Sequence, residues 1–391
     1  MFAVVEQYAH HLTALPARAV RGEGPKTEEP LPARRVTSWC EPVGALVATP
    51  APRGLADSLG EFALEANTSG GSSPANSRRP ERQRRRAMLA CMRFSIWPDL
   101  DEPWPELRAL VTHADVTGWD TVYVEDHFIT HSAPESPLLE ATGTLAALAA
   151  ATERIRLGTL VLSVTYRHPA VIANWAATVD QLSAGRLVLG LGAGWEEHEH
   201  AAYGLRLGSP GERVDRFVEG LAVVQGLLTQ PRTTVEGRFF QVRDAACEPK
   251  PHQDHVPILV GAKGPRMLGI VAEHADRWNM WGSPVQVADK AAVLDAHCAR
   301  IGRDPRSIER STQSMVCVTD DPARAQAFLE EHGASGRAAI AGSAAEVAER
   351  IAAYAEVGVD EYIVLTSDLG RGAQRLETLD GLGAALVATQ S

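Results

Sequence analysis

The sequence of 391 residues has no run of 18 apolar residues, few cysteines and no excess of basic side chains. Without such a run no transmembrane helix is expected, because a spanning helix needs about 20 apolar residues. The five cysteines, Cys40, Cys91, Cys247, Cys298 and Cys317, form no C-x-x-C pair, which predicts a reduced, cytoplasmic chain without a disulfide framework or zinc cluster. A formal net charge of −11 argues against a dedicated nucleic-acid binder, which needs a net basic surface.

Several sequence motifs of common enzyme classes are also missing. A dinucleotide fingerprint that begins with Gly190 and Gly192 would need its third glycine at position 195, which is Trp195. Neither a P-loop nor a G-x-S-x-G nucleophile elbow occurs. The stretch EEHEH at 196–200 holds two histidines without forming H-E-x-x-H. Residues two apart on a helix lie about 200° apart, so His198 and His200 face away from each other. We therefore expect no metal site.

The first 91 residues differ from the rest of the chain. They hold nine of the 24 prolines, a Gly/Ser-rich stretch at Thr68–Ser77 and an arginine cluster at Arg78–Arg86. No hydrophobic period persists in them, which predicts a disordered extension. The arginine cluster is typical of a solvated linker, with a patch for an anionic partner or a targeting arm as the alternative. Folding signals begin abruptly at Met92, which favours a biological start at Met88 or Met92 and a mis-called extension upstream.

From Met92 to Ser391 short apolar runs alternate with helical patterns, and this region is the predicted domain. Val214–Leu228 carries apolar residues at the spacing of one buried helical face. Eight strand candidates alternating with helices in about 300 residues favour parallel βαβ units that close into a (β/α)8 TIM barrel. An open doubly wound sheet is the alternative. The candidate strands are Phe94–Trp97, Thr121–Val124, Ile155–Leu162, Leu187–Leu191, Pro257–Val260, Arg277–Met280, Met315–Val318 and Tyr362–Leu365.

One interval between strand candidates is longer than the others. Leu187 and Pro257 are 70 positions apart, and the gap contains Thr233–Val242 (TTVEGRFFQV), a Glu-Gly turn flanked by β-forming residues. This pattern predicts an inserted hairpin. Barrels shape their pockets by insertions in the loops at the carboxyl rim.

An Asp-His pair, Asp126-His127, follows the second predicted strand. Barrel enzymes carry their chemistry at the carboxyl ends of strands, and a histidine beside a carboxylate exchanges protons near neutral pH. These residues are therefore catalytic candidates. The alternative is that both side chains only satisfy backbone groups of a loop.

Two glycine-containing turns follow the fourth and fifth predicted strands. The turn at Gly192–Gly194 allows close approach of backbone N–H groups to a ligand, or simply forms a tight barrel corner. The segment from Gly261 through Lys263 and Gly264 to Arg266 precedes a predicted helix. Free N–H groups at a helix start beside two cations favour a phosphate site. A plain helix start is the alternative.

The ordered motifs from Met92 to about Leu386 resemble the luciferase-like flavin- and deazaflavin-dependent oxidoreductases, and in particular actinobacterial proteins described as probable coenzyme F420-dependent oxidoreductases. The resemblance rests on several blocks and does not extend to residues 1–91. Those blocks are FSIW at 94–97, WDTVYVEDHF at 119–128, RLGTLVLSVTYRHP at 156–169, LSAGRLVLGLGAGW at 182–195, CEPKP at 247–251 and the segment 257–279 ending in ADRWN.

The resemblance implies a TIM barrel whose mouth holds the coenzyme. It implies that Asp126 and His127 face the deazaflavin ring, with His127 the proton donor or acceptor. It also implies a non-proline cis peptide, which matches Ser163–Val164 here, and a contact from Asn174 to the polar edge of the ring. Two further groups of cofactor-binding residues are implied. Gly192, Ala193 and Gly194 would lie along the ribityl-phosphate side, and Gly261, Lys263, Gly264 and Arg266 would bind phosphate, although many relatives have Gly-Gly where this chain has Gly261-Ala262.

The implied function is hydride transfer between C5 of F420 and a small organic substrate. An enzyme that uses reduced FMN and O₂, like alkanesulfonate monooxygenase, is the first alternative, and a non-catalytic flavin-binding protein is the second. Dimerisation is common in the family, so a homodimer is a further expectation.

Overall fold

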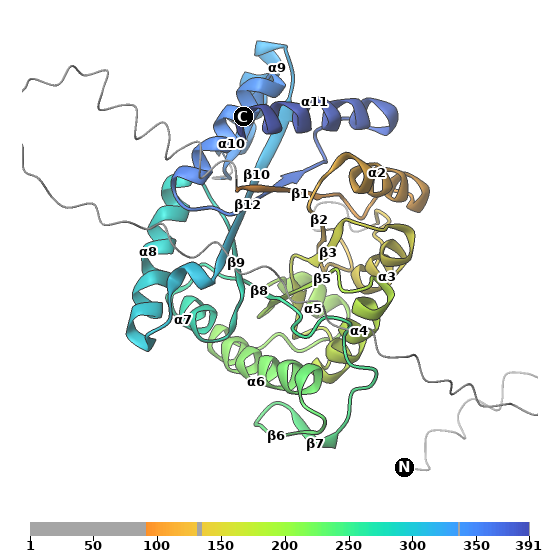
Figure 1. Cartoon of the computed structure of the whole chain (residues 1–391), viewed down its shortest axis with the longest axis vertical. Helices are drawn as coiled ribbons and strands as arrows, with labels where there is room; N and C mark the ends of the chain where they lie inside the picture. The colour runs from red at the N-terminus through yellow and green to blue at the C-terminus, as the bar shows by residue number, and fades with distance from the viewer. Residues whose placement is uncertain (1–90, 131–134, 335–336, 391) are drawn as a thin grey trace, which may run out of the picture. The chain divides into compact units, whose positions relative to one another are not determined.

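The computed structural model describes residues 91–130, 135–334 and 337–390. All of the predicted extension except Cys91, including its arginine cluster, its candidate start at Met88 and Cys40, therefore lies outside the described residues. The described chain forms a ring of parallel strands surrounded by helices (Figure 1). The ring closes because β12 pairs with both β10 and β1. Its eight strands are β1 Arg93–Trp97, β2 Thr121–Val124, β3 Arg156–Thr159, β5 Leu187–Gly192, β8 Ile258–Gly261, β9 Arg277–Trp281, β10 Glu309–Val318 and β12 Glu361–Leu365.

This closed ring confirms the predicted TIM barrel and shows that the alternative of an open doubly wound sheet is wrong. Every neighbouring pair in the ring is parallel, as expected when helical crossovers connect the strands.

The helices that cover the barrel have clear sequence signals at their starts. Proline occupies the first turn of α4 and α6, where its missing N–H is not needed. Serine capping boxes begin α6, α8 and α10. The helices are α2 Trp104–Thr117, α3 Ala141–Ala151, α4 Pro169–Leu182, α5 Glu197–Ala202, α6 Pro210–Thr229, α7 Pro265–His274, α8 Pro284–Ile301, the 3₁₀ turn η2 Pro305–Ser307, α9 Pro322–Ala334, α10 Ala344–Glu356 and α11 Gly372–Gln390.

The seventh barrel strand differs from its prediction. The predicted run Met315–Val318 is only the end of β10, where it pairs with β11 (Ala339–Gly342). The part that belongs to the barrel is the polar segment 309–314, which pairs with β9 and β12. Ser311 and Gln313 both pair with Asn279 of β9, whereas Arg310 pairs with Asp295 of the surrounding helix α8. Gln313, for example, accepts a hydrogen bond at Oε1 from Asn279 Nδ2 at 2.8 Å. A search for apolar runs cannot detect a strand whose interior side chains are polar.

The third predicted strand is divided in two. The run Ile155–Leu162 becomes β3 and the short β4 (Leu162–Ser163), which pairs with β5. The non-proline cis peptide bond is Leu160–Val161, in the break between β3 and β4. The prediction that it is Ser163–Val164 was therefore wrong by three residues, because the chain leaves the regular strand before β4 rather than after it.

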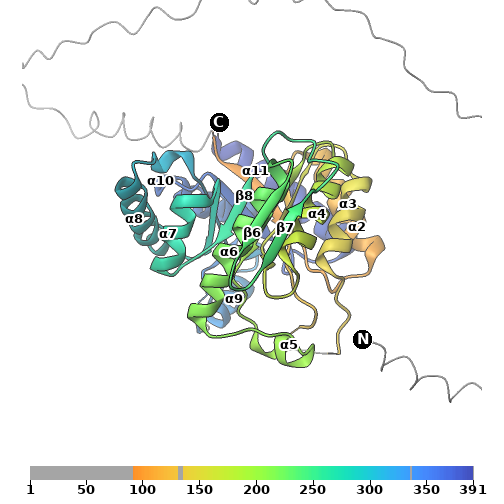
Figure 2. The ribbon, with the colours of Figure 1, turned by 90° about the horizontal axis from the view of Figure 1, so that it is seen from below.

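The predicted hairpin is present as β6 (Thr233–Glu236) and β7 (Gln241–Ala245). It follows α6 and lies outside that helix (Figure 1), where the backbone N–H groups of Phe239 and Phe240 donate to Glu219 of α6. No described residue of the hairpin lines the cavity at the barrel mouth. The loops that do lie at the mouth include those with α5 and α9, which project from the same end of the barrel (Figure 2).

Candidate active site

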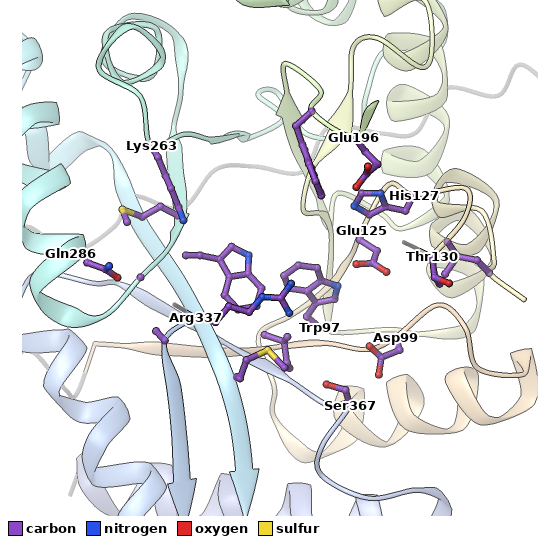
Figure 3. A pocket seen from close by; sticks show the side chains of 18 of the residues that line it. Trp97, Asp99, Glu125, His127, Thr130, Glu196, Lys263, Gln286, Arg337 and Ser367 are labelled. Carbon is purple, nitrogen blue, oxygen red and sulfur yellow. The ribbon is translucent and has the colours of Figure 1, made fainter. Parts of the chain in front are cut away.

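A cavity of about 650 Å³ opens at the carboxyl ends of the barrel strands. Residues at or after the ends of seven of the eight barrel strands contribute to it, which is the location of active sites in TIM barrels. In Figure 3, Lys263 and Gln286 lie on one side of the cavity, and Glu125, His127 and Glu196 lie on the opposite side. The lining residues are Trp97, Asp99, Glu125, His127, Ile129, Thr130, Leu138, Trp195, Glu196, Lys263, Met280, Trp281, Gly282, Gln286, Lys290, Met315, Arg337, Ala338, Leu365 and Ser367.

His127 lies on the cavity wall and is held by Glu199 of α5. Its Nδ1 is 2.9 Å from Glu199 Oε2, and its ring makes an edge-to-face contact with Trp195 at 5.6 Å between centroids. Because a carboxylate can only accept hydrogen bonds, an ionised Glu199 places the proton on Nδ1 and leaves Nε2 as the other site for proton exchange.

Glu199 is fully buried and is well supplied with donors. The backbone N–H groups of Phe128 and Ile129 donate to Oε1 at 2.7 and 3.0 Å, and the Tyr166 hydroxyl donates to Oε2. Burial alone would raise the pKa of Glu199, but these hydrogen bonds and the His127 ring outweigh it and lower the pKa. Glu199 is therefore a carboxylate at neutral pH and fixes the orientation of His127.

Asp126 does not line the cavity. Its carboxylate accepts hydrogen bonds from Arg167 Nη1 and from the backbone N–H of Ser163, both at 2.8 Å. Glu125 and His127, on either side of it, both line the cavity. Asp126 and His127 both follow β2, as predicted. The side chain of Asp126, however, contacts Ser163 and Arg167 rather than the cavity.

Ser163 and Val164 lie behind the cavity wall. The Ser163 hydroxyl is 2.6 Å from Thr165 Oγ1, and the Val164 side chain lies against Gly220 of α6. Asn174 is on the exposed side of α4, with Nδ2 4.0 Å from Cys247 Sγ. None of the three lines the cavity.

The glycines after β5 permit close packing. A Cβ at Gly192 would lie 2.6 Å from Val161 Cγ2, and one at Gly194 would lie 2.4 Å from Thr165 Oγ1. Gly194 also has φ +80°, which glycine adopts without strain. The tight barrel corner named as the alternative is therefore present. That Gly192, Ala193 and Gly194 also contact a coenzyme stays a prediction.

The segment after β8 provides one residue to the cavity, Lys263. The pKa of Lys263 is lowered by burial of its ammonium group. Gly261 ends β8, and Gly264 precedes α7, which begins at Pro265. Arg266 points to α6, where it contacts Asp215. The predicted anion site thus has a helix start and one cavity cation, whereas Arg266 is engaged elsewhere.

The EEHEH segment has a structural explanation. His200 is buried, with Nε2 2.7 Å from Thr165 Oγ1 and Nδ1 2.6 Å from the carbonyl oxygen of Glu196. These contacts attach α5 to the loop after β4. Within residues 91–130, 135–334 and 337–390, no group of three or more His, Cys, Asp or Glu side chains is arranged to hold a metal ion.

Several cavity residues were not predicted. Asp99 follows β1, and burial together with Asp101 and Glu125 raises its pKa to about 7. Burial also raises the pKa of Glu125, which the neighbouring His127 lowers only in part. Trp97 and Trp281 make an edge-to-face pair with centroids 5.7 Å apart on the wall. The signal available in the sequence was their position directly at or after strand ends.

A family model described as luciferase-like monooxygenase matches residues 85–336. The chain belongs to the luciferase-like monooxygenase family. This confirms the family predicted from the sequence. In this family the chain is 33% identical over 235 residues to an F420-dependent glucose-6-phosphate dehydrogenase from Beutenbergia cavernae, covering 59% of this chain and 69% of that protein. It is 30% identical over 222 residues to an F420-dependent hydroxymycolic acid dehydrogenase from Mycobacterium tuberculosis, covering 56% and 61%.

Solved structures share the fold of this luciferase-like protein. An F420-dependent secondary alcohol dehydrogenase in complex with an F420–acetone adduct superimposes with a TM-score of 0.67 at 19% identity, covering 75% of this chain and 99% of that chain. A monooxygenase from Streptomyces bottropensis superimposes with a TM-score of 0.65 at 23% identity, covering 77% and 100%. None of the described helices has the length and apolarity that a membrane span requires.

Proposed function

We propose that this protein is an F420-dependent oxidoreductase that transfers a hydride between the deazaflavin and a small organic substrate. The observation that carries the proposal is the His127–Glu199 pair on the wall of the 650 Å³ cavity, in a chain similar to F420-dependent dehydrogenases. F420 supplies a hydride donor or acceptor carbon, and the protein supplies binding, orientation and proton exchange.

The cavity suits a flat ring with an anionic tail. Trp97, Trp281 and Met280 provide apolar wall, and Lys263 provides a cation near the free N–H groups at the start of α7. The ring would lie among the apolar residues, and its phosphate near Gly261, Lys263 and Gly264. The glycine turn after β5 would flank the chain between ring and phosphate.

His127 is the proton-exchanging residue in this proposal. When an alcohol is oxidised, its hydroxyl proton passes to Nε2, while the C–H hydrogen leaves with its electron pair as hydride. Glu199 then faces an imidazolium and stabilises it. In the reverse direction Nε2–H gives the proton to the carbonyl oxygen. Asp126 acts indirectly, since its bonds to Arg167 and Ser163 hold the loop beside His127.

The free thiols among the described residues support a reducing compartment, which we take to be the cytoplasm. Cys91, Cys247, Cys298 and Cys317 form no disulfide in the described structure. Homodimerisation stays a prediction of the family resemblance.

Titration of the purified protein with F420 and with FMN, followed by quenching of coenzyme fluorescence, tests the proposal. We expect F420 to bind in the micromolar range, and Lys263→Gln to weaken this binding about 10-fold or more through loss of a charged contact. Arg306→Gln is the control, because Arg306 is exposed, pairs with Asp304 and does not line the cavity. Binding of FMN but not F420 would replace the proposal by the reduced-FMN monooxygenase. Binding of either coenzyme without turnover of any substrate would favour a non-catalytic flavin-binding protein.

A further inference from the structure

Charged side chains of both signs line the cavity, and Arg337 lies between Lys263 and Glu125, near Trp97 (Figure 3). Lys263 lies on one side, and Glu125 and Glu196 lie on the other (Figure 3). Asp99 lies nearer to Glu125 than to Lys263 in the same view. In the proposed function the basic side receives the anionic tail of the coenzyme, so the acidic side is left for the substrate.

Asp99 and Glu125 have no counter-ion of their own. No hydrogen bond or ion pair joins either carboxylate to another residue of the described chain. Arg375 of α11 is the cation that favours ionisation of Asp99, but its guanidinium is engaged by the buried carboxylate of Glu102. Asp101 and Glu125 add negative charge beside Asp99.

The surroundings of Glu125 are similar. His127 is the group that favours its ionisation, whereas Asp101 and Glu199 oppose it. None of the cavity cations Lys263, Lys290 and Arg337 is among the groups that shift the pKa of Glu125. Partly buried carboxyl groups without a counter-ion cost free energy when ionised, so a ligand that supplies positive charge is favoured here.

Aromatic side chains complete this part of the wall. Trp97, the last residue of β1 and two positions before Asp99, packs edge-to-face on Trp281, and Trp195 packs on His127. The faces of tryptophan rings attract cations, most strongly in sites from which water is excluded. This aromatic wall is an observation independent of the carboxyl groups, and it fits the same kind of ligand.

We propose that Asp99, Glu125 and Trp97 form a subsite for an organic cation, so that the substrate carries a protonated amine or a quaternary ammonium group. The inference rests on the proposed function, because it assigns the substrate class of the same cavity. It separates this chain from a sugar-phosphate dehydrogenase, whose substrate is an anion.

Binding of two isosteric probes tests the subsite without turnover. Choline and 3,3-dimethylbutan-1-ol have nearly the same shape, but only choline is charged. We expect choline to bind at least about 10-fold more tightly than the neutral alcohol at pH 8, because its charge makes a charge-assisted contact. Quenching of tryptophan fluorescence in coenzyme-free protein measures both affinities. Equal affinities for the two probes, or displacement of choline by glucose 6-phosphate, would overturn the inference.

The pH dependence of choline binding gives a second measurement on the wild-type protein. Choline keeps its charge at all pH values, so a change in affinity comes from the protein. Because burial and the neighbouring carboxylates raise the pKa of Asp99 to about 7, affinity should rise about 10-fold in total between about pH 5 and about pH 8 and then level off. The other charged or titratable groups that line the cavity or lie near Asp99 include Asp101, Glu125, His127, Lys263, Lys290, Arg337 and Arg375. Asp99→Asn should therefore remove most of the rise, and a rise unchanged in Asp99→Asn would overturn the assignment to Asp99.

Two isosteric variants and one control complete the experiment. Asp99→Asn and Glu125→Gln should each reduce the preference for choline about 10-fold, while Glu197→Gln, an exposed residue of α5, should leave it unchanged. Thermal unfolding checks that each variant is folded. F420 titration of the same samples separates the two proposals: F420 binding without a preference for choline contradicts the cation subsite and leaves the oxidoreductase proposal standing.

Discussion

Charged residues at the amino end of the barrel are paired with one another, whereas two carboxyl groups at the carboxyl end have no such partner among the described residues. At the amino end, Glu361 accepts from Arg277 Nη1 at 3.3 Å and from the Tyr123 hydroxyl at 3.1 Å. Glu309 accepts from Arg93 Nη2 at 2.7 Å and lies 2.9 Å from Arg277 Nε. At the carboxyl end, Asp99 and Glu125 line a cavity without such partners. Paired charges hold the fold together, whereas charges without partners reduce its stability and remain available to a ligand.

The largest effect should come from removing the proton-exchanging residue of the carboxyl end. We expect His127→Ala to lower turnover about 10²- to 10⁴-fold, the range for loss of a general acid or base. The affinity for F420 should change little, because the proposed contacts of its tail lie at Lys263. Steady-state kinetics and F420 titration measure the two quantities separately.

The matched control is His113→Ala. His113 lies on α2, with Nε2 2.6 Å from Asp380 Oδ1, and does not line the cavity. Its replacement should leave turnover unchanged. If His127→Ala had the same rate as the wild type, His127 would have no part in the mechanism.

At the amino end the main effect should be on folding. Glu361→Ala removes one of the carboxylates that pair with the buried guanidinium of Arg277. Breaking a buried ion pair typically lowers the free energy of unfolding by about 3–5 kcal/mol. Chemical denaturation measures the loss in the free energy of unfolding. Glu197→Ala, at an exposed position, should change it by less than about 0.5 kcal/mol. Similar values for the two variants would contradict the structural role of the amino-end network.

Replacement of Asp99 should have a smaller effect on the free energy of unfolding, and it should stabilise the fold. Its folded-state pKa of about 7 is above the ordinary value of about 3.9, so ionisation destabilises the folded state as pH rises between these values. Asp99→Asn should therefore be more stable than the wild type by about 1–2 kcal/mol at pH 8, and the difference should disappear towards pH 4. Thermal or chemical unfolding across this pH range measures it, and a difference that is independent of pH would contradict the raised pKa.

The contrast between the two ends also explains which parts of the fold could be predicted. Seven barrel strands have apolar runs that a sequence search detects, and the barrel follows from their number and alternation with helices. The barrel part of β10 was not predicted, because it contains polar side chains whose partners, such as Asn279, are distant in the sequence. The hairpin was predicted from its turn, but its packing against α6 depends on tertiary contacts with Glu219.

The site was predicted less completely than the fold. Position after a strand identified His127 and Lys263, but the sequence does not give the direction of neighbouring side chains. Alternation along the chain brings Glu125 and His127 to the cavity and directs Asp126 to Arg167. The partnership of His127 with Glu199 joins residues 72 positions apart, so no local pattern contains it. Comparison with the family supplied Asn174 and Ser163–Val164, which in this chain lie away from the cavity lining.

A crystal structure of the protein with bound F420 is the most direct test of the central claim. The account predicts that the deazaflavin ring lies in the cavity at the carboxyl end, in contact with His127, with the phosphate on the side of Lys263. A ring bound elsewhere on the barrel, or a cavity that stays empty in crystals saturated with F420, would contradict it.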